Sequence, residues 1–198
     1  MAYVDVRWDN CCGEALWMTG PGWDDVGPVE PDELGLSESV QQQIAQWRDD
    51  EDGDCSPRPA DERRRQLVRS LEVARLMQLE LGDDHEVWRA SGLRTGCPLL
   101  ALEGGEADLA RRVGRRAERL ERVPIQQLAA SANTRWRIRQ WRREGRALDG
   151  APGDARWRAE GLDIAAQLQQ EVGLAHFICF LGGRTEQPPV EPFRPWGD

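Results

Sequence analysis

The chain has 198 residues, of which 39% are hydrophobic and 31% charged, and its formal net charge is -9 at pH 7. This length can bury one sizeable core without disulfide bonds or metal ions, and no segment approaches the roughly 20 apolar residues of a membrane-spanning helix. The N-terminus has no basic segment followed by an apolar run, so we expect a cytoplasmic protein without a membrane attachment.

The first elements predicted along the chain are a β-hairpin and a helix. Residues 3–8 alternate apolar and polar side chains, as a half-buried strand does, and residues 15–18 can return beside them. Residues 19–33 contain six glycines and prolines, which predicts a loop. A helix is predicted from Ser37, a suitable N-cap, with an apolar stripe at Val40, Ile44 and Trp47.

An acidic segment follows this helix. Residues 49–54 include five acids, and Pro57 and Pro59 come shortly after them. Because such a segment has little apolar surface to bury, we predict that it ends the helix and forms a mobile acidic loop.

The strongest pattern in the chain is a unit that occurs twice. A helix over residues 61–81 is followed by Gly82 and a short strand at residues 85–88, and the same order returns 91 residues later with Gly173. Six of nineteen positions are identical at this offset. The glycines are typical helix-ending residues in the left-handed conformation. We therefore predict an α+β protein of two pseudo-repeated helix–helix–strand halves with a small sheet, to which the N-terminal hairpin belongs.

The segment between the two copies differs in composition. Residues 97–102 are apolar enough for a short strand, and residues 106–122 have a helical composition. From Arg111 to Arg146 there are twelve arginines and three acids, which gives this segment a net charge of +9 and leaves -18 for the rest of the chain. The arginines can pair internally with the acidic remainder, or they can form a surface for an anionic partner.

Residues 123–146 resemble the helix-turn-helix of bacterial regulators. The resemblance implies a first helix with Leu128 and Ala129, a turn at Asn133 and Thr134, and a second helix with Ile138 and Trp141 inward. The DNA-binding residues would be Arg135, Arg137, Arg139, Arg142 and Arg143, because such a helix presents arginines to guanine edges or phosphates. The turn is one residue shorter than usual for that family, and a chain of net charge -9 is poorly suited to non-specific binding of DNA.

A second interpretation of the same segment relates it to the N-terminal half. Residues 138–141 repeat the Ile-x-Gln-Trp pattern of residues 44–47 at an offset of 94, close to the main offset. The segment would then be part of a degenerate second copy, and we favour this interpretation.

A further resemblance concerns residues 15–88 and, more weakly, 131–180. The residues that carry it include the helix segment 73–82 and, ahead of it, Trp17, Gly22, Asp24, Asp25, Val26, the run 31–37 and Trp47. Together they resemble a group of small acidic proteins common in actinobacteria. The resemblance implies an inhibitor or an immunity partner of a toxin, and no catalytic activity.

Signals for catalysis and for metals are weak. The chain has no Gly-x-Ser-x-Gly, His-Glu-x-x-His or phosphate-loop motif, so we predict that it is not an enzyme and uses no cofactor. Cys11 and Cys12 are adjacent, but no CxxC motif accompanies them and the five cysteines are an odd number, so neither a metal site nor a disulfide framework is expected. The two histidines, His85 and His176, occupy equivalent positions of the repeat.

These observations lead to one preferred function. We expect a non-enzymatic protein that binds a basic partner, such as a toxin, through its acidic segments and one aromatic anchor, and DNA binding is the alternative. The expected division of the chain is 1–102, 103–183 and a proline-rich tail at 184–198. The expected partner-binding residues are Trp23, Asp24, Asp25, Asp49, Asp50, Glu51, Asp52 and Asp54.

Overall fold

The structure is a computed structural model, and it describes residues 2–6, 16–19, 26–52, 59–89, 99–102, 109–113, 119–147 and 154–180. The class is α+β, as predicted: four α-helices accompany two four-stranded mixed sheets in the described part of the chain.

The first sheet has the strand order β3-β2-β1-β4. Its strands are β1 (Ala2–Val6), β2 (Leu16–Thr19), β3 (Val26–Pro28) and β4 (His85–Trp88). The predicted N-terminal hairpin is present, because β1 and β2 pair antiparallel with Val4 opposite Met18. β4 lies parallel to β1, which requires the crossover that the intervening helices provide.

The second sheet has the equivalent order β7-β6-β5-β8. Its strands are β5 (Leu99–Leu102), β6 (Leu109–Val113), β7 (Arg119–Val123) and β8 (Phe177–Phe180). β5 pairs antiparallel with β6 and parallel with β8, so it belongs to this sheet although we had assigned residues 99–102 to the first half.

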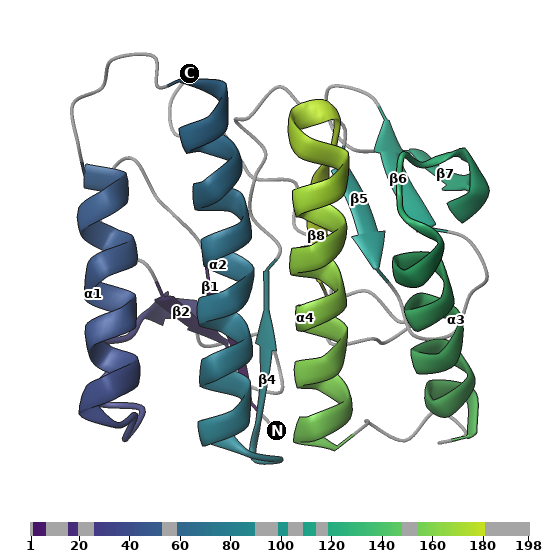
Figure 1. Ribbon diagram of the computed structural model, residues 1–198. Helices are drawn as coiled ribbons and strands as arrows, with labels where there is room; N and C mark the ends of the chain where they lie inside the picture. The colour runs from purple at the N-terminus through teal and green to yellow at the C-terminus, as the bar shows by residue number, and fades with distance from the viewer. Residues whose placement is uncertain are drawn as a thin grey trace.

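Four helices lie side by side over the strands in the order α1-α2-α4-α3 (Figure 1). They are α1 (Glu38–Asp52), α2 (Ala60–Leu81), α3 (Ala132–Ala147) and α4 (Ala155–Val172). Each half therefore runs through three strands, two helices and a fourth strand parallel to its first. The origin of the two halves in a duplication stays a prediction from the sequence.

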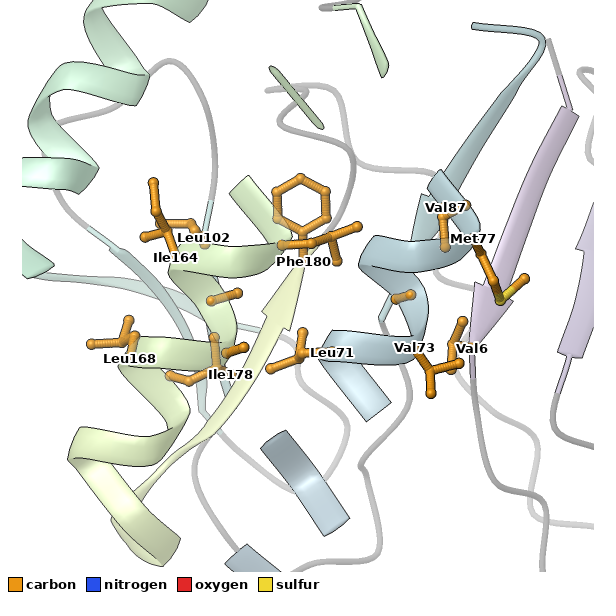
Figure 2. Close-up of a cluster of buried hydrophobic side chains, with 14 of the residues drawn as sticks. Val6, Leu71, Val73, Met77, Val87, Leu102, Ile164, Leu168, Ile178 and Phe180 are labelled. Carbon is orange, nitrogen blue, oxygen red and sulfur yellow. The ribbon is translucent and has the colours of Figure 1, made fainter. Parts of the chain in front are cut away.

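The two halves meet at the centre of the layer, where α2 packs against α4 (Figure 1). In the sheets they meet at Arg89 and Phe180, which form an antiparallel bridge at the ends of β4 and β8. Figure 2 shows the apolar side chains beneath the helices, among them Leu71 and Val73 of α2 and Ile164 and Leu168 of α4. These side chains belong to one buried cluster that includes strand residues of both sheets.

Both central helices end as the sequence predicted. Gly82 has φ 63° and Gly173 has φ 60°, a conformation that other residues adopt only with strain. One glutamine in each helix then fixes the strand that follows. The Gln78 amide donates to the carbonyl oxygens of Gly82 and His85 (2.9 and 3.0 Å), and its own oxygen accepts from the backbone N–H of Val87 (2.9 Å).

Gln169 makes the same three bonds in the second half. Its amide donates to the carbonyl oxygens of Gly173 (2.7 Å) and His176 (2.9 Å), and its oxygen accepts from the backbone N–H of Ile178 (2.8 Å). A buried polar group costs free energy unless it is hydrogen-bonded. The three bonds made by Gln78 and by Gln169 therefore explain why each half tolerates a buried glutamine in its core. The backbone carbonyl groups of His85 and His176 thus accept equivalent hydrogen bonds in the two halves.

Three predictions for individual segments are wrong. Residues 49–52 do not form a loop, because α1 continues to Asp52. Residues 26–28 form β3 at the edge of the first sheet, a position that tolerates Pro28. Residues 106–122 are not helical where the structure describes them: 109–113 and 119–122 lie in β6 and β7, whose pairing over five positions outweighs their helical composition.

The predicted helix-turn-helix is also wrong. Leu128 is extended, and residues 123–131 contain a single three-residue 3₁₀ turn, Ile125–Gln127. Asn133 and Thr134 belong to the first turn of α3 and form no link between two helices. Pro124 directly follows β7 and forms the N-cap of the 3₁₀ turn, and the backbone is already extended again at Leu128, so no α-helix develops in between. Ile138 and Trp141 do point inward, and both are buried.

Candidate protein-binding surfaces

The structure describes part of the predicted acidic surface. Trp23, Asp24, Asp25 and Asp54 lie outside the described residues, whereas residues 49–52 form the C-terminal end of α1. Four acids at this end oppose the helix dipole, since carbonyl groups already concentrate negative charge there. The acids therefore do not help α1 to form.

The turn before α1 brings a second acidic segment to the same helix. Glu30 forms an ion pair with Arg48 (3.1 Å), the residue next to Asp49. The turn itself is held by side chains, because a carboxylate oxygen of Glu33 accepts from the backbone N–H of Glu30 (3.0 Å) and one of Asp32 accepts from that of Glu33 (3.1 Å). Residues 30–33 thus form a hydrogen-bonded turn within the segment 19–33 that we had predicted as a loop.

The turn ends at the N-terminus of α1, where the α2 carboxylate Glu80 binds Ser37. Its two oxygens accept from the backbone N–H (2.8 Å) and the hydroxyl group (2.5 Å) of Ser37. Glu171 of α4 does the same for Ser131, whose backbone N–H lies 2.7 Å from it, and also accepts from the hydroxyl group of Thr134 (2.7 Å). Burial raises the pKa of Glu171, but the bonds from Ser131, Thr134 and Gln167 outweigh this effect and hold it below its ordinary value.

The five arginines proposed for DNA binding do not form one surface. Arg142 is buried with 1% of its surface exposed, and the guanidinium of Arg135 donates to the carbonyl oxygen of Ala130 at 3.0 and 2.7 Å. Arg139 and Arg143 are exposed. Arg135 and Arg142 are therefore bound or buried within the fold, and Arg139 and Arg143 are left at the surface.

Arg137 forms ion pairs with Glu160 (2.5 Å) and Asp163 (2.8 Å) of α4. Burial lowers the pKa of Arg137, but its hydrogen bonds and charge interactions with these two acids outweigh that effect and raise the pKa above its ordinary value. Arg137 thus links α3 to α4 through ion pairs.

Trp136 is a surface residue that we did not predict. It lies on the outer side of α3 with 55% of its surface exposed, the largest such value among the described bulky apolar residues. The offset of 94 residues could have identified it, because it aligns Trp136 with Gln42, which is exposed on α1. Arg139 and Arg143 follow Trp136 at spacings of three and seven, so the three residues share one face of the helix. We call this set the α3 face.

Buried polar residues elsewhere serve the fold. Arg158 of α4 is 1% exposed and reaches into the first half, where it donates to the Gln78 amide oxygen (3.1 Å) and to the carbonyl oxygen of Gly82 (3.1 Å). Arg89 donates to the hydroxyl group of Ser70 (2.7 Å) and lies 4.4 Å from the centre of the Phe177 ring. The hydrogen bonds of Arg158 and the contact of Arg89 with Phe177 join the two halves.

A hollow of about 350 Å³ lies near the end of α3 and the start of α4. Its lining residues also have structural contacts, since Asp154 caps α4 by accepting from the backbone N–H of Trp157 (2.7 Å) and Glu160 binds Arg137. The lining consists of Glu144, Asp154, Arg156, Trp157 and Glu160.

Among the residues that the structure describes, no group of three or more His, Cys, Asp or Glu side chains is placed to hold a metal ion. None of the helices in the described ranges is both long and apolar enough to cross a membrane. Comparisons with protein-family models, with curated proteins and with solved structures gave no match.

Proposed function

We propose that the protein is a non-enzymatic binding protein, an inhibitor or immunity-type partner of a basic protein such as a toxin. The observation that carries this proposal is the ion pair between Glu30 and Arg48, which places the described ends of the two acidic segments at one helix. Segments that are separate in the sequence then contribute to one negatively charged surface around the end of α1.

The cost of these acids to the helix supports a role outside folding. A like charge at the wrong end of a helix costs about 0.3–1 kcal/mol at an exposed position. The chain nevertheless has four acids at residues 49–52 and no basic residue in the last turn of α1. Binding of a positively charged partner would explain these acidic residues, which do not stabilise α1 itself.

The use of the arginines supports the same proposal. Residues 111–146 contain an excess of nine positive charges, but Arg135, Arg137 and Arg142 are bound or buried within the described structure. A negative surface accelerates encounter with a basic protein and disfavours nucleic acid. Exposed ion pairs contribute only about 0–1 kcal/mol each, so an aromatic anchor must supply much of the affinity, and Trp23 is our candidate.

The proposal can be tested by a pull-down from the native cell with the tagged full chain. We expect basic proteins in the bound fraction, and we expect Asp50→Asn with Asp52→Asn to reduce their capture. The matched control is Asp84→Asn with Glu144→Gln, which removes the same charge at exposed positions away from the end of α1. Recovery of nucleic acid alone, or equal loss of capture in both double variants, would contradict the proposal.

A further inference from the structure

The outer side of α3 combines one exposed tryptophan with two exposed cations. Trp136 is 55% exposed, and Arg139 and Arg143 are exposed beside it on the α3 face. None of the three side chains has a hydrogen bond or ion pair to another residue of the described structure, in contrast to the side chain of Arg137 on the neighbouring side of the helix. An exposed indole followed along the same helix face by two unpaired guanidinium groups is available to a partner.

The equivalent helix of the first half shows that the fold does not need these residues. At the offset of 94, the inward residues of α1 and α3 correspond, as Ile44 does to Ile138 and Trp47 to Trp141, and each of these is buried. On the outer face, α1 has Gln42, Ala45 and Asp49 in place of Trp136, Arg139 and Arg143. The equivalent helix α1 thus has neither an aromatic residue nor a cation at these three positions.

We propose that the α3 face binds an acidic polypeptide segment of a protein partner. Tryptophan and arginine are the residues most enriched at the energetic centres of protein interfaces. The two arginines select negative charge, and Trp136 offers apolar area to a neighbouring apolar side chain of the segment. This surface is separate from the acidic surface of the proposed function and opposite to it in charge, so the two proposals can fail independently.

Nucleic acid fits the same face less well. Its affinity for proteins comes mainly from the number of phosphates that cations neutralise, and the α3 face supplies two. The chain as a whole has a net charge of -9, which repels a long polyanion more than a short acidic segment. Binding of DNA is therefore the competing outcome that the experiment must distinguish.

The test uses an array of random 12-residue peptides beside an array of random 12-nucleotide single-stranded DNAs, each probed with the full chain. We expect the bound peptides to be enriched in Asp and Glu together with apolar residues. The variant Trp136→Gln with Arg139→Ala, which copies the residues of α1, should bind the best of these peptides at least tenfold more weakly. Arg143→Asp alone should also weaken binding.

The matched control is Leu79→Gln with Arg65→Ala, which removes one exposed apolar residue and one exposed cation from α2. This variant should retain the affinity of the wild-type chain, and circular dichroism should show that all variants are folded. The proposal is overturned if acidic peptides are not enriched, if the α3 variants bind as tightly as the control, or if the DNA array is bound more tightly in a Trp136-dependent way.

Discussion

Arg89 and Phe180 occupy equivalent positions of the two halves and exchange both of their backbone hydrogen bonds. The N–H of Arg89 donates to the carbonyl oxygen of Phe180 (2.8 Å), and the N–H of Phe180 donates to that of Arg89 (3.0 Å). A reciprocal pair between equivalent residues defines a local two-fold relation between β4 and β8. The side chains break this symmetry, because Arg89 binds Ser70 whereas Phe180 lies against Trp141, with ring centres 5.9 Å apart.

The first prediction concerns Gly161, the equivalent of Ser70. A Cβ atom at Gly161 would lie 2.5 Å from a ring carbon of Phe180 and 2.6 Å from one of Trp141, both buried side chains. We expect Gly161→Ala to lower the free energy of unfolding by about 1–3 kcal/mol, measured by urea denaturation. Gly27→Ala is the control, because no atom lies within 4 Å of its Cβ position, and it should change stability far less.

The second prediction concerns the glutamine that ties each central helix to its strand. Gln169→Met keeps the side-chain length but leaves the Ile178 N–H and two carbonyl oxygens without their side-chain partner. Since one unsatisfied buried group costs roughly 1–3 kcal/mol, we expect a loss of at least that size in chemical denaturation. Gln170→Met changes the exposed neighbour and should lie within about 0.5 kcal/mol of the wild type. Equal effects of the two substitutions would show that the three bonds do not stabilise the fold.

The third prediction compares two equivalent tryptophans. Trp141 stacks on Trp157 at 4.5 Å, and the indole N–H of each donates to the backbone oxygen of the other at 2.8 and 2.9 Å. Trp47 is buried to the same degree, but its indole N–H has no acceptor among the described residues. We expect Trp141→Phe to lower the thermal midpoint more than Trp47→Phe, because it removes a hydrogen bond as well as volume. A larger decrease of the thermal midpoint for Trp47→Phe than for Trp141→Phe would contradict a stabilising role of the Trp141 indole hydrogen bond.

The fourth prediction follows from the lowered pKa of Glu171. A carboxylate with a lower pKa in the folded state contributes stability that is fully present above its unfolded value, near 4.5, and is lost as the pH falls through the folded value. Glu171→Gln should therefore destabilise the protein most at pH 7, and the difference from the wild type should shrink below pH 4.5. Denaturation midpoints between pH 7 and pH 3 measure this, and a difference independent of pH would contradict it.

Elements with a local signal could be predicted from the sequence. The apolar stripe of α1, the N-cap at Ser37 and the left-handed glycines depend on neighbouring residues alone, and the structure confirms them. β6 and β7 could not be recognised, because their arginine-rich residues show no clear alternation and their hydrogen bonds go to distant segments.

The candidate site was predictable only in part. The outward direction of Arg139 and Arg143 was correct, since it follows from helical spacing. We predicted that Arg142 points outward, but it is buried. The width of the face that α3 presents to its neighbours depends on tertiary packing and cannot be predicted from helical spacing alone. We did not predict the exposure of Trp136, which the structure shows, although its alignment with Gln42 could have indicated it.

The most direct test of the proposed function is the rate of association with a captured basic protein, measured by stopped flow over a range of salt concentrations. If the acidic surface at α1 steers the partner, the rate constant should fall by about tenfold or more between low and high salt. Asp50→Asn with Asp52→Asn should lower the rate at low salt, whereas Asp84→Asn with Glu144→Gln should not. A rate constant that is independent of salt and equal in all three proteins would contradict the account.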